Sequence, residues 1–412
     1  MIASPRVALF VVAAVLLATV VSGCAPATRA SGGSPHARTS PAPPTKLPKP
    51  VDPIAHLSLE QRVGQLFMVG TTASGAEQVT IDAITKHNVG SIFLSGRSHG
   101  GVGATAAVVD RFRALVSSTT TGGEQLLVAT DQEGGEVQVL QGPGFAAMPT
   151  GLTQGQLSAH ALESDARTWG SELTSAGVNM DLAPVVDLLP SAASAVHNPP
   201  IGAFKREYGF SLPTIVEHAT AFRDGMDASN VITVMKHFPG LGFVTQNTDT
   251  ARNVTDTVTS ADGDAVAIYR DEIARGADCI MVSSAVYRRI APGKPAVFSS
   301  AVVTALLRKQ LGFNGVVISD DLSASEAVDQ WSPAQRAILA IEAGVDIVLV
   351  SADPAVAAQM VEAVVTKART DQAFAALVDA AARRVVLLKA RDGLSATPNG
   401  SLVQNARGAR RL

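Results

Sequence analysis

A single-domain (β/α)8 barrel is the fold class that this sequence predicts, on two observations. Eight short apolar runs recur along the chain, and the stretches between them are long enough for helices. Alternating strands and helices favour a parallel sheet, and eight repeats favour its closure into a barrel. Several runs also end in polar residues, at the rim where such barrels carry active sites. The predicted strands are residues 64–70, 89–95, 125–130, 178–186, 231–236, 278–283, 315–319 and 345–350.

Helix signals fill the intervals between these runs. Ser58 precedes the first apolar period and is a predicted N-cap. Apolar residues recur close to the helical period over residues 157–173. Helices at 355–365 and 373–388 would complete the barrel after the last strand, and no second block of strands follows. The sequence therefore predicts one catalytic domain over residues 56–395.

The composition favours a large core and excludes some functions. The 412 residues are 46% hydrophobic and 17% charged, with a net charge of −3. The body of the chain has no basic block, so nucleic-acid binding is not supported. Aromatic residues are only 4% of the chain, which favours a compact pocket for one or two sugars over a wide platform for long polysaccharides.

The N-terminus has the features of a targeting segment. Arg6 precedes an apolar run at 7–21 that is too short for a comfortable membrane span, so residues 1–23 are a predicted signal peptide. Residues 21–24, Val-Ser-Gly-Cys, resemble the bacterial lipobox. That resemblance implies that Cys24 is lipidated and anchors the protein to the cell membrane on its extracytoplasmic face. The alternative is an ordinary secretory signal with a chance cysteine.

Two further segments have few apolar residues that could form a core. Residues 24–55 are rich in Pro, Ser, Thr and Ala and are a predicted disordered tether. Residues 396–412 are a predicted loose tail. In the body between them Cys279 is the one cysteine, so no internal disulfide is expected. Cys279 lies in an apolar strand, which favours a core thiol over a catalytic one.

Acidic and basic residues gather at the ends of four predicted strands. Residues 131–135, Asp-Gln-Glu-Gly-Gly, follow the third strand, and the fourth contains Asp181 and ends near Asp187. The fifth ends in residues 236–240, Lys-His-Phe-Pro-Gly, and the seventh in the Asp-Asp pair at 320–321. Each group alone is compatible with a structural salt bridge at the rim. Together they indicate a site for a polar substrate.

Three of these segments are similar to signatures of glycoside hydrolase family 3: residues 131–135, 236–240 and Ser-Asp-Asp-Leu at 319–322. Residues 182–187 and 343–346 match two further family segments, in the expected order. Within the family the chain resembles the single-domain β-N-acetylglucosaminidases, a branch favoured over the glucosidases by the second Asp of the pair. The resemblance implies a retaining exo-enzyme that releases non-reducing terminal GlcNAc from cell-wall-derived glycans, without a cofactor.

The resemblance also implies roles for single residues. Asp320 stands where the family has its nucleophile, which forms a glycosyl-enzyme intermediate. Asp321 is either a second carboxylate beside the site or a structural one. Arg206 matches a sugar-binding arginine only if two extra residues are allowed before it. The substrate-binding positions implied by the family are Asp131, Arg206, Lys236 and His237.

The acid/base of this branch is missing from its usual place. The family pattern there is Lys-His-Phe-Pro-Gly-His-Gly, four variable residues, then Asp-Ser-His. Here Asn247 stands in the Asp position and Asp249 in the His position, and no histidine follows His237. Either Asp249 is the proton donor, with a raised pKa, or another acid such as Glu133, Asp187 or Asp256 serves. The remaining alternative is that the acid/base is absent, which would leave a slow enzyme or a sugar-binding protein.

Other classes of site find little support. The eight histidines are scattered, with none at short ligand spacing to another His or Cys, so no metal site is predicted. No Gly-rich nucleotide fingerprint stands between a strand and a helix. Two rival functions stay open: a β-glucosidase or glycoside phosphorylase of the same family, and a lipoprotein that binds wall glycans without turnover.

Overall fold

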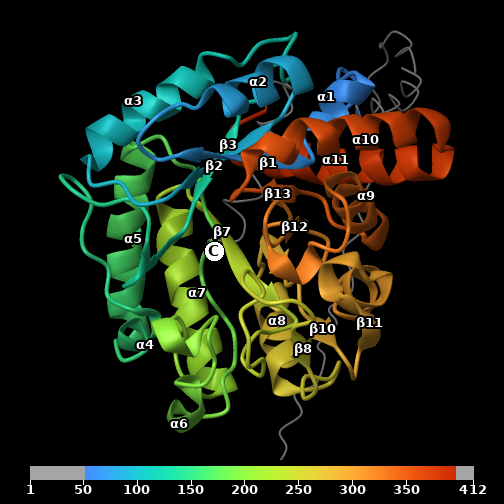
Figure 1. The fold of residues 1–412 in the computed structure, drawn as a ribbon. Helices are drawn as coiled ribbons and strands as arrows, with labels where there is room; N and C mark the ends of the chain where they lie inside the picture. The colour runs from blue at the N-terminus through green and yellow to red at the C-terminus, as the bar shows by residue number, and fades with distance from the viewer. Residues whose placement is uncertain (1–51, 396–412) are drawn as a thin grey trace, which may run out of the picture. The chain divides into compact units, whose positions relative to one another are not determined.

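Eight parallel strands form the centre of the computed structural model, which describes residues 52–395 (Figure 1). Their order in the sheet is β12-β9-β7-β6-β3-β2-β1-β13. A bridge between Ile318 and Ile347 joins the two outer strands, so the sheet closes into the predicted barrel. The strands are β1 (Phe67–Thr72), β2 (Ser91–Ser95), β3 (Leu127–Thr130), β6 (Met180–Asp181), β7 (Ile232–Phe238), β9 (Cys279–Val282), β12 (Val316–Ser319) and β13 (Val348–Val350).

Each of the eight predicted strands is present, but two boundaries differ from the prediction. Ser58 caps α1 (Leu59–Gly64) through a capping box with Gln61, so the start of the first predicted strand belongs to that helix. The fourth strand pairs regularly only at Met180–Asp181, not over 178–186. Pro184 has no N–H for the ladder, and pairing resumes as one bridge between Val185 and Lys236.

Helices surround the strands in Figure 1. The predicted helix over 157–173 is α5, which Ser158 caps and which buries Leu162, Trp169 and Leu173. The two predicted C-terminal helices are α10 and α11. The other elements are α2 (Gln78–His87), α3 (Gly101–Arg113), α4 (Gly151–Gln154), α5 (Ala159–Ser175), α6 (Ala192–Ala195), α7 (Leu212–Ala228), α8 (Asp264–Ala274), α9 (Pro333–Ala343), α10 (Ala357–Thr370), α11 (Gln372–Arg391), the π-helix η3 (Ala301–Gln310), and the short 3-10 turns η1 (Gly202–Phe204), η2 (Ala296–Phe298), η4 (Glu326–Val328) and η5 (Pro354–Val356).

The core has two parts, because successive strand residues face opposite sides of the sheet. On β1, Met68 belongs to the cluster that fills the barrel, whereas Phe67 and Val69 belong to the cluster between the strands and the helices. Cys279 is a fully buried free thiol of the inner cluster. Burial raises its pKa well above the ordinary value, so the interpretation as a core thiol is confirmed.

Asp346 stabilises the seam where the barrel closes. Its fully buried carboxylate accepts a 2.8 Å hydrogen bond from the backbone N–H of Val317 on β12. It also pairs with Arg308 at 2.6 Å and with Arg384 at 2.8 Å, from η3 and α11. The β12–β13 seam and two outer helices are thereby fixed to one another.

Two small sheets, which the sequence did not predict, form in the loops at the carboxyl ends of the strands. One contains β8 (Thr255–Asp256), β10 (Val286–Tyr287) and β11 (Ala291–Pro295), in the loops after β7 and β9. The other is the hairpin of β4 (Gln132–Gly134) and β5 (Val137–Gln138) after β3. These additions shape the rim of the barrel around the predicted site.

The predicted signal peptide at 1–23, the lipidated Cys24, most of the tether and the tail at 396–412 lie outside the described residues. Between residues 52 and 395, no helix combines the length and the apolar character needed to cross a membrane.

Candidate active site

A cavity of about 280 Å³ opens at the carboxyl ends of the strands. Its walls come from most strands of the barrel, including Phe93 of β2, Met281 of β9 and Leu349 of β13. Ligand pockets in proteins typically have volumes of about 300–1,000 Å³. This cavity lies at the lower limit of that range, so it suits a compact ligand. The cavity brings together every predicted catalytic and substrate-binding residue: Asp131, Arg206, Lys236, His237, Asp249 and Asp320.

A network of alternating charges forms one wall. The buried Lys236 ammonium lies 2.5 Å from an Asp131 oxygen and 2.7 Å from a Glu133 oxygen. Glu133 accepts two hydrogen bonds of 2.7 Å from the Arg206 guanidinium. Burial alone would raise the pKa of Glu133, but the positive charges of Arg206 and Lys236 lower it to about 2. Glu133 is therefore ionised at neutral pH and is a poor proton donor.

Arg206 reaches this wall in spite of the two extra residues before it. The turn η1 and the left-handed Lys205, with φ of 55°, reverse the chain between Gly202 and Arg206. A further hydrogen bond of 2.8 Å from Arg206 to the carbonyl of Pro200 fixes the guanidinium. Arg206 thus lines the cavity beside Asp131 and Lys236, and its sugar-binding role stays a prediction.

A buried carboxylate contacts the Nδ1 side of the His237 ring. Its Nδ1 atom lies 2.7 Å from an Asp187 oxygen, and the other Asp187 oxygen accepts a 2.7 Å hydrogen bond from the Leu241 backbone. The contact with a carboxylate requires a proton on Nδ1 and fixes the orientation of the ring. Asp187 was one candidate proton donor, but its oxygens serve His237 and Leu241, and it does not line the cavity.

Asp320 follows β12 directly, and its backbone N–H donates to the carbonyl of Val282 on β9. Burial raises the pKa of its carboxyl, while the charges of His237 and Lys236 act in the opposite direction. One Asp320 oxygen accepts a 2.9 Å hydrogen bond from the backbone of Asp321. A buried carboxylate at a strand end, close to cations, can act as a nucleophile or a base.

Asp321 lines the cavity and also has a structural role, so neither of the two alternatives for this residue is excluded. Its carboxylate accepts hydrogen bonds from the Ser323 hydroxyl at 2.7 Å, from the Ala324 backbone at 2.9 Å and from the Ser351 backbone at 2.7 Å. These bonds join the loop after β12 to the end of β13. Asp321 thereby fixes the backbone on which Asp320 stands.

Asp249 faces the same cavity from the loop after β7. The residue as a whole is exposed, but the surrounding protein desolvates its carboxyl. Desolvation, together with the negative charges of Asp320 and Asp321, raises its pKa to about 6 against the weaker effects of His237 and Arg206. A carboxyl with this pKa can donate and accept a proton near neutral pH.

The loop that carries Asp249 is anchored to the loop after β12. The Thr248 carbonyl accepts hydrogen bonds from the Ser325 hydroxyl at 2.8 Å and from the Ala327 backbone at 3.0 Å. The Asp249 carbonyl accepts one of 3.2 Å from the Glu326 backbone. The segment 325–327 thus joins the loops of the two carboxylates. Its residues carry no motif in the sequence, and sequence reasoning missed them.

Asp256, a third candidate donor, lies outside this arrangement. Its carboxylate accepts hydrogen bonds from the backbone of Val258 and from the backbone and hydroxyl of Thr259, at 2.6 to 2.7 Å. It does not line the cavity. Asp249 is therefore the candidate donor that geometry and pKa favour over Glu133, Asp187 and Asp256.

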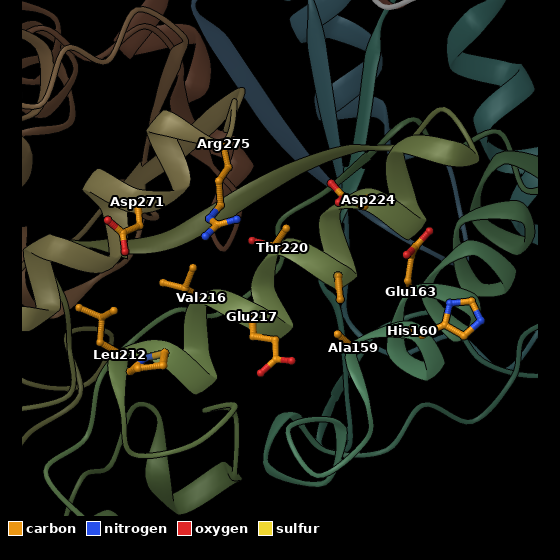
Figure 2. Close-up of a pocket in the computed structure, with 12 residues that line it drawn as sticks. Ala159, His160, Glu163, Leu212, Val216, Glu217, Thr220, Asp224, Asp271 and Arg275 are labelled. Carbon is orange, nitrogen blue, oxygen red and sulfur yellow. The ribbon is translucent and has the colours of Figure 1, made fainter. Parts of the chain in front are cut away.

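A larger cavity, of about 590 Å³, lies on the outer helices instead (Figure 2). It is lined by residues of α5, α7 and α8, among them Glu163, Glu217 and Asp271, and by none of the residues at the strand ends. Barrel active sites lie at the carboxyl ends of the strands, so size does not identify this groove as catalytic. In the described part of the chain, no group of three or more His, Cys, Asp or Glu side chains is arranged to hold a metal ion.

A barrel with two carboxylates and several cations in a small rim cavity suits a glycoside hydrolase. Comparisons with known proteins identify the family. The "Glycosyl hydrolase family 3 N terminal domain" matches residues 58–388, so the chain belongs to glycoside hydrolase family 3.

Named relatives point to one branch of this family. A "Beta-hexosaminidase" of Nitrosomonas eutropha is 32% identical over 302 residues, 70% of this chain and 80% of the relative. One of Xylella fastidiosa is 34% identical over 292 residues, 69% and 81% of the two chains. The crystal structure of a beta-N-acetylhexosaminidase from Beutenbergia cavernae superposes with a TM-score of 0.80 at 60% identity, over 81% of this chain and 98% of that one. These matches support a β-hexosaminidase of family 3.

The charge network makes a prediction about stability. The pKa of Glu133 is lowered from 4.5, its ordinary value, to about 2 in the folded state. The ionised carboxylate therefore stabilises the fold fully at pH values above 4.5, and this stabilisation is lost as the pH falls toward 2. Glu133→Gln should therefore lower the free energy of unfolding at pH 7 by about 3 kcal/mol, and by less than half of that at pH 3. Urea unfolding followed by circular dichroism measures both values. Glu136→Gln, at a neighbouring exposed position, is the control. If Glu133→Gln lowers the free energy of unfolding equally at pH 7 and at pH 3, the prediction is refuted.

Proposed function

We propose that the protein is a retaining exo-β-N-acetylglucosaminidase that releases non-reducing terminal GlcNAc. The observation that carries this proposal is the pair of carboxyls, Asp320 and Asp249, that line one small cavity from different loops. The names of the relatives support the choice of sugar. The cavity of about 280 Å³ supports an exo mode, since it suits a single terminal sugar.

Asp320 is the nucleophile in this mechanism. Its carboxylate attacks the anomeric carbon and forms a glycosyl-enzyme ester as the bond to the leaving group breaks. Asp249 gives its proton to the departing oxygen, so the leaving group departs as a neutral alcohol. Ionised Asp249 then removes a proton from water, which attacks the same carbon, and Asp320 is released as a carboxylate. The raised pKa of Asp249, about 6, suits a group that must alternate between these states.

The charge network orients the sugar. Asp131 is partly exposed to the cavity, so one of its oxygens can accept a hydrogen bond from a sugar hydroxyl while Lys236 neutralises the carboxylate. Lys236, Arg206 and His237 supply donors from the same side. Burial raises the pKa of Asp320, and the charges of His237 and Lys236 oppose this rise, which favours the ionised form that nucleophilic attack requires.

We further propose that the protein is anchored at the extracytoplasmic face of the cell membrane through a lipidated Cys24, and that its substrates derive from the cell wall. The lipobox-like residues 21–24 and the Pro- and Ser-rich segment after them support this location. One membrane-bound acyl anchor and a long tether would hold the barrel near wall glycans.

The proposed activity is tested with the soluble form that lacks residues 1–24. We expect hydrolysis of 4-nitrophenyl β-N-acetylglucosaminide but not of the β-glucoside. Asp320→Asn should lower kcat by about 10⁴-fold or more, because the substitution removes the nucleophile but keeps the shape of the side chain. Binding of GlcNAc without turnover would instead indicate a sugar-binding protein, and dependence of turnover on phosphate would indicate a phosphorylase.

The role of Asp249 predicts a dependence on the leaving group. Asp249→Asn should lower kcat by about 10²- to 10⁴-fold on disaccharides, which need protonation, and far less on a dinitrophenyl glycoside. In the wild type, kcat/KM should fall as pH rises above about 6, because the donor loses its proton, and this limb should vanish in the variant. Asp256→Asn is the control. A uniform loss on both substrates would count against Asp249 as the acid.

The membrane anchor is tested by Cys24→Ser in the full chain expressed in a bacterium that processes lipoproteins. The wild type should incorporate labelled palmitate and sediment with membranes. The variant should lose the label and appear in the soluble fraction, since one thioether-linked anchor is removed. Cys279→Ser, which changes the buried thiol, should leave the label unchanged. Label retained on Cys24→Ser would contradict the proposal.

A further inference from the structure

The proposed proton donor, Asp249, is held in place through its backbone. Its carboxyl accepts no hydrogen bond from any described residue, whereas one Asp320 oxygen accepts a hydrogen bond from the Asp321 backbone. The position of the Asp249 carboxyl therefore depends on the conformation of the residues that carry it. We call residues 247–252, after β7, the Asp249 loop, and residues 320–329, after β12, the Asp320 loop.

Asn247 fixes the turn that presents Asp249. Its side-chain Oδ1 atom accepts a 3.0 Å hydrogen bond from the backbone N–H of Asp249, two residues further on. This bond closes an Asx turn, which Asn and Asp side chains form with the backbone two residues ahead. Asn247 stands where the branch that the chain resembles has the Asp of its dyad. In this chain, the residue at that position binds the backbone of the proposed acid.

Ser325 holds the same turn from the Asp320 loop. Its hydroxyl donates a 2.8 Å hydrogen bond to the carbonyl of Thr248, and both residues are buried. Ser325 stands at the N-cap position of η4, where a serine hydroxyl commonly accepts a bond from its own helix, yet its side chain makes no such bond. The hydroxyl serves the contact between the two loops instead.

Backbone bonds and one ion pair add to the contact between the loops. The backbone N–H groups of residues 326 and 327 donate to the carbonyls of Asp249 and Thr248, at 3.2 and 3.0 Å. At the exposed edge, the Arg252 Nε atom lies 2.9 and 2.8 Å from the two carboxylate oxygens of Asp329. Exposed ion pairs contribute little and are screened by salt. The buried bonds therefore carry the contact, and among them only the bond of Ser325 comes from a side chain.

The place of the turn also decides the charge state of Asp249. Asp320 and Asp321 act on its carboxyl with negative charge, and His237 and Arg206 act on it with positive charge. Desolvation and the two negative charges raise its pKa from the ordinary value of 3.8 to about 6. These effects weaken with distance and with access of water. A turn released from the Asp320 loop would therefore let the pKa of Asp249 fall toward its ordinary value.

We propose that Asn247 and Ser325 are positioning residues that hold Asp249 at the catalytic cavity, Asn247 through a local turn and Ser325 through the loop of the nucleophile. Both act on the acid through the backbone of residues 248–249. Because Ser325 belongs to the Asp320 loop, the positions of the donor and of the nucleophile are set together. The inference rests on the proposed function, in which Asp249 is the proton donor.

Ser325→Ala and Asn247→Ala test the positioning through the leaving group. Each should lower kcat by about 10- to 100-fold on GlcNAc disaccharides, whose leaving group needs a proton. On a dinitrophenyl β-N-acetylglucosaminide, whose leaving group needs none, each should lower kcat by less than about three-fold. A loss of folded protein would lower both rates alike, so the ratio of the two rates reports the position of the acid.

The pH dependence gives a second readout. In Ser325→Ala and Asn247→Ala, the fall of kcat/KM at high pH should begin below the wild-type value of about 6, because the released carboxyl gains water and loses its proton sooner. Asn247→Asp keeps an oxygen for the Asx turn and adds a negative charge beside Asp249. It should therefore keep most of the rate on disaccharides and move the fall to higher pH.

Ser332→Ala is the matched control. Ser332 is an exposed serine farther along the same segment, and its hydroxyl caps α9 by accepting from the Gln335 backbone. Loss of this cap lowers stability, but the ratio of the two rates should stay that of the wild type. Hydrogen–deuterium exchange needs no turnover. The amides of residues 247–252 should exchange about ten-fold faster in Ser325→Ala than in the wild type or in Ser332→Ala.

The positioning role is overturned if Ser325→Ala slows both substrates equally. It is also overturned if Ser325→Ala leaves the pH dependence and the exchange unchanged while Asp249→Asn shows the leaving-group dependence of an acid. A failure of the proposed function looks different, because Asp249→Asn itself would then show no such dependence. In that case the role of Asp249 fails, and the role assigned to Asn247 and Ser325 fails with it.

Discussion

The burial of the Lys236 ammonium is the constraint on which the rest of the site depends. A buried cation is costly unless anions surround it. Asp131 and Glu133 lie directly after β3, and Arg206 follows the turn η1, so two separate segments must converge on β7 to balance the charges. The same network that makes the burial of Lys236 tolerable therefore gathers the sugar-binding residues. A change in one member leaves the others with uncompensated charge.

The two proposed catalytic carboxyls, Asp320 and Asp249, are identical side chains in different electrostatic environments. Asp320 stands on a strand end next to His237 and Lys236, whose charges oppose the effect of burial on its pKa. Asp249 stands on an anchored loop, and the charges of Asp320 and Asp321 add to the effect of desolvation on its pKa. Burial raises the pKa of both carboxyls, and the proposed two-step hydrolysis assigns the ionised role to Asp320, beside His237 and Lys236, and the protonated role to Asp249.

The loop after β7 lines two cavities at the rim. Asp249 lines the catalytic cavity, whereas Asn253 and Thr255 line a second one of about 320 Å³. The backbone of this loop is held by residues 325–327, which belong to the same loop as Asp320. In this chain Asn247 and Asp249 stand where the branch it resembles has its Asp-Ser-His dyad, so these hydrogen bonds hold the loop of the proposed proton donor.

The sequence by itself determined the barrel, because eight apolar runs alternate with helix-length stretches and their polar ends must meet at one rim. It also determined the positions of Asp131, Lys236, His237 and Asp320, since each adjoins a strand. The tertiary structure decided what local sequence could not encode. Asp321 joins two loops and Asp187 orients His237, and neither role is evident locally because their partners, Ser351 and His237, are 30 and 50 residues away. The raised pKa of Asp249 likewise arises only when folding brings it toward Asp320 and displaces water around it, since desolvation and proximity of charge are properties of the folded chain.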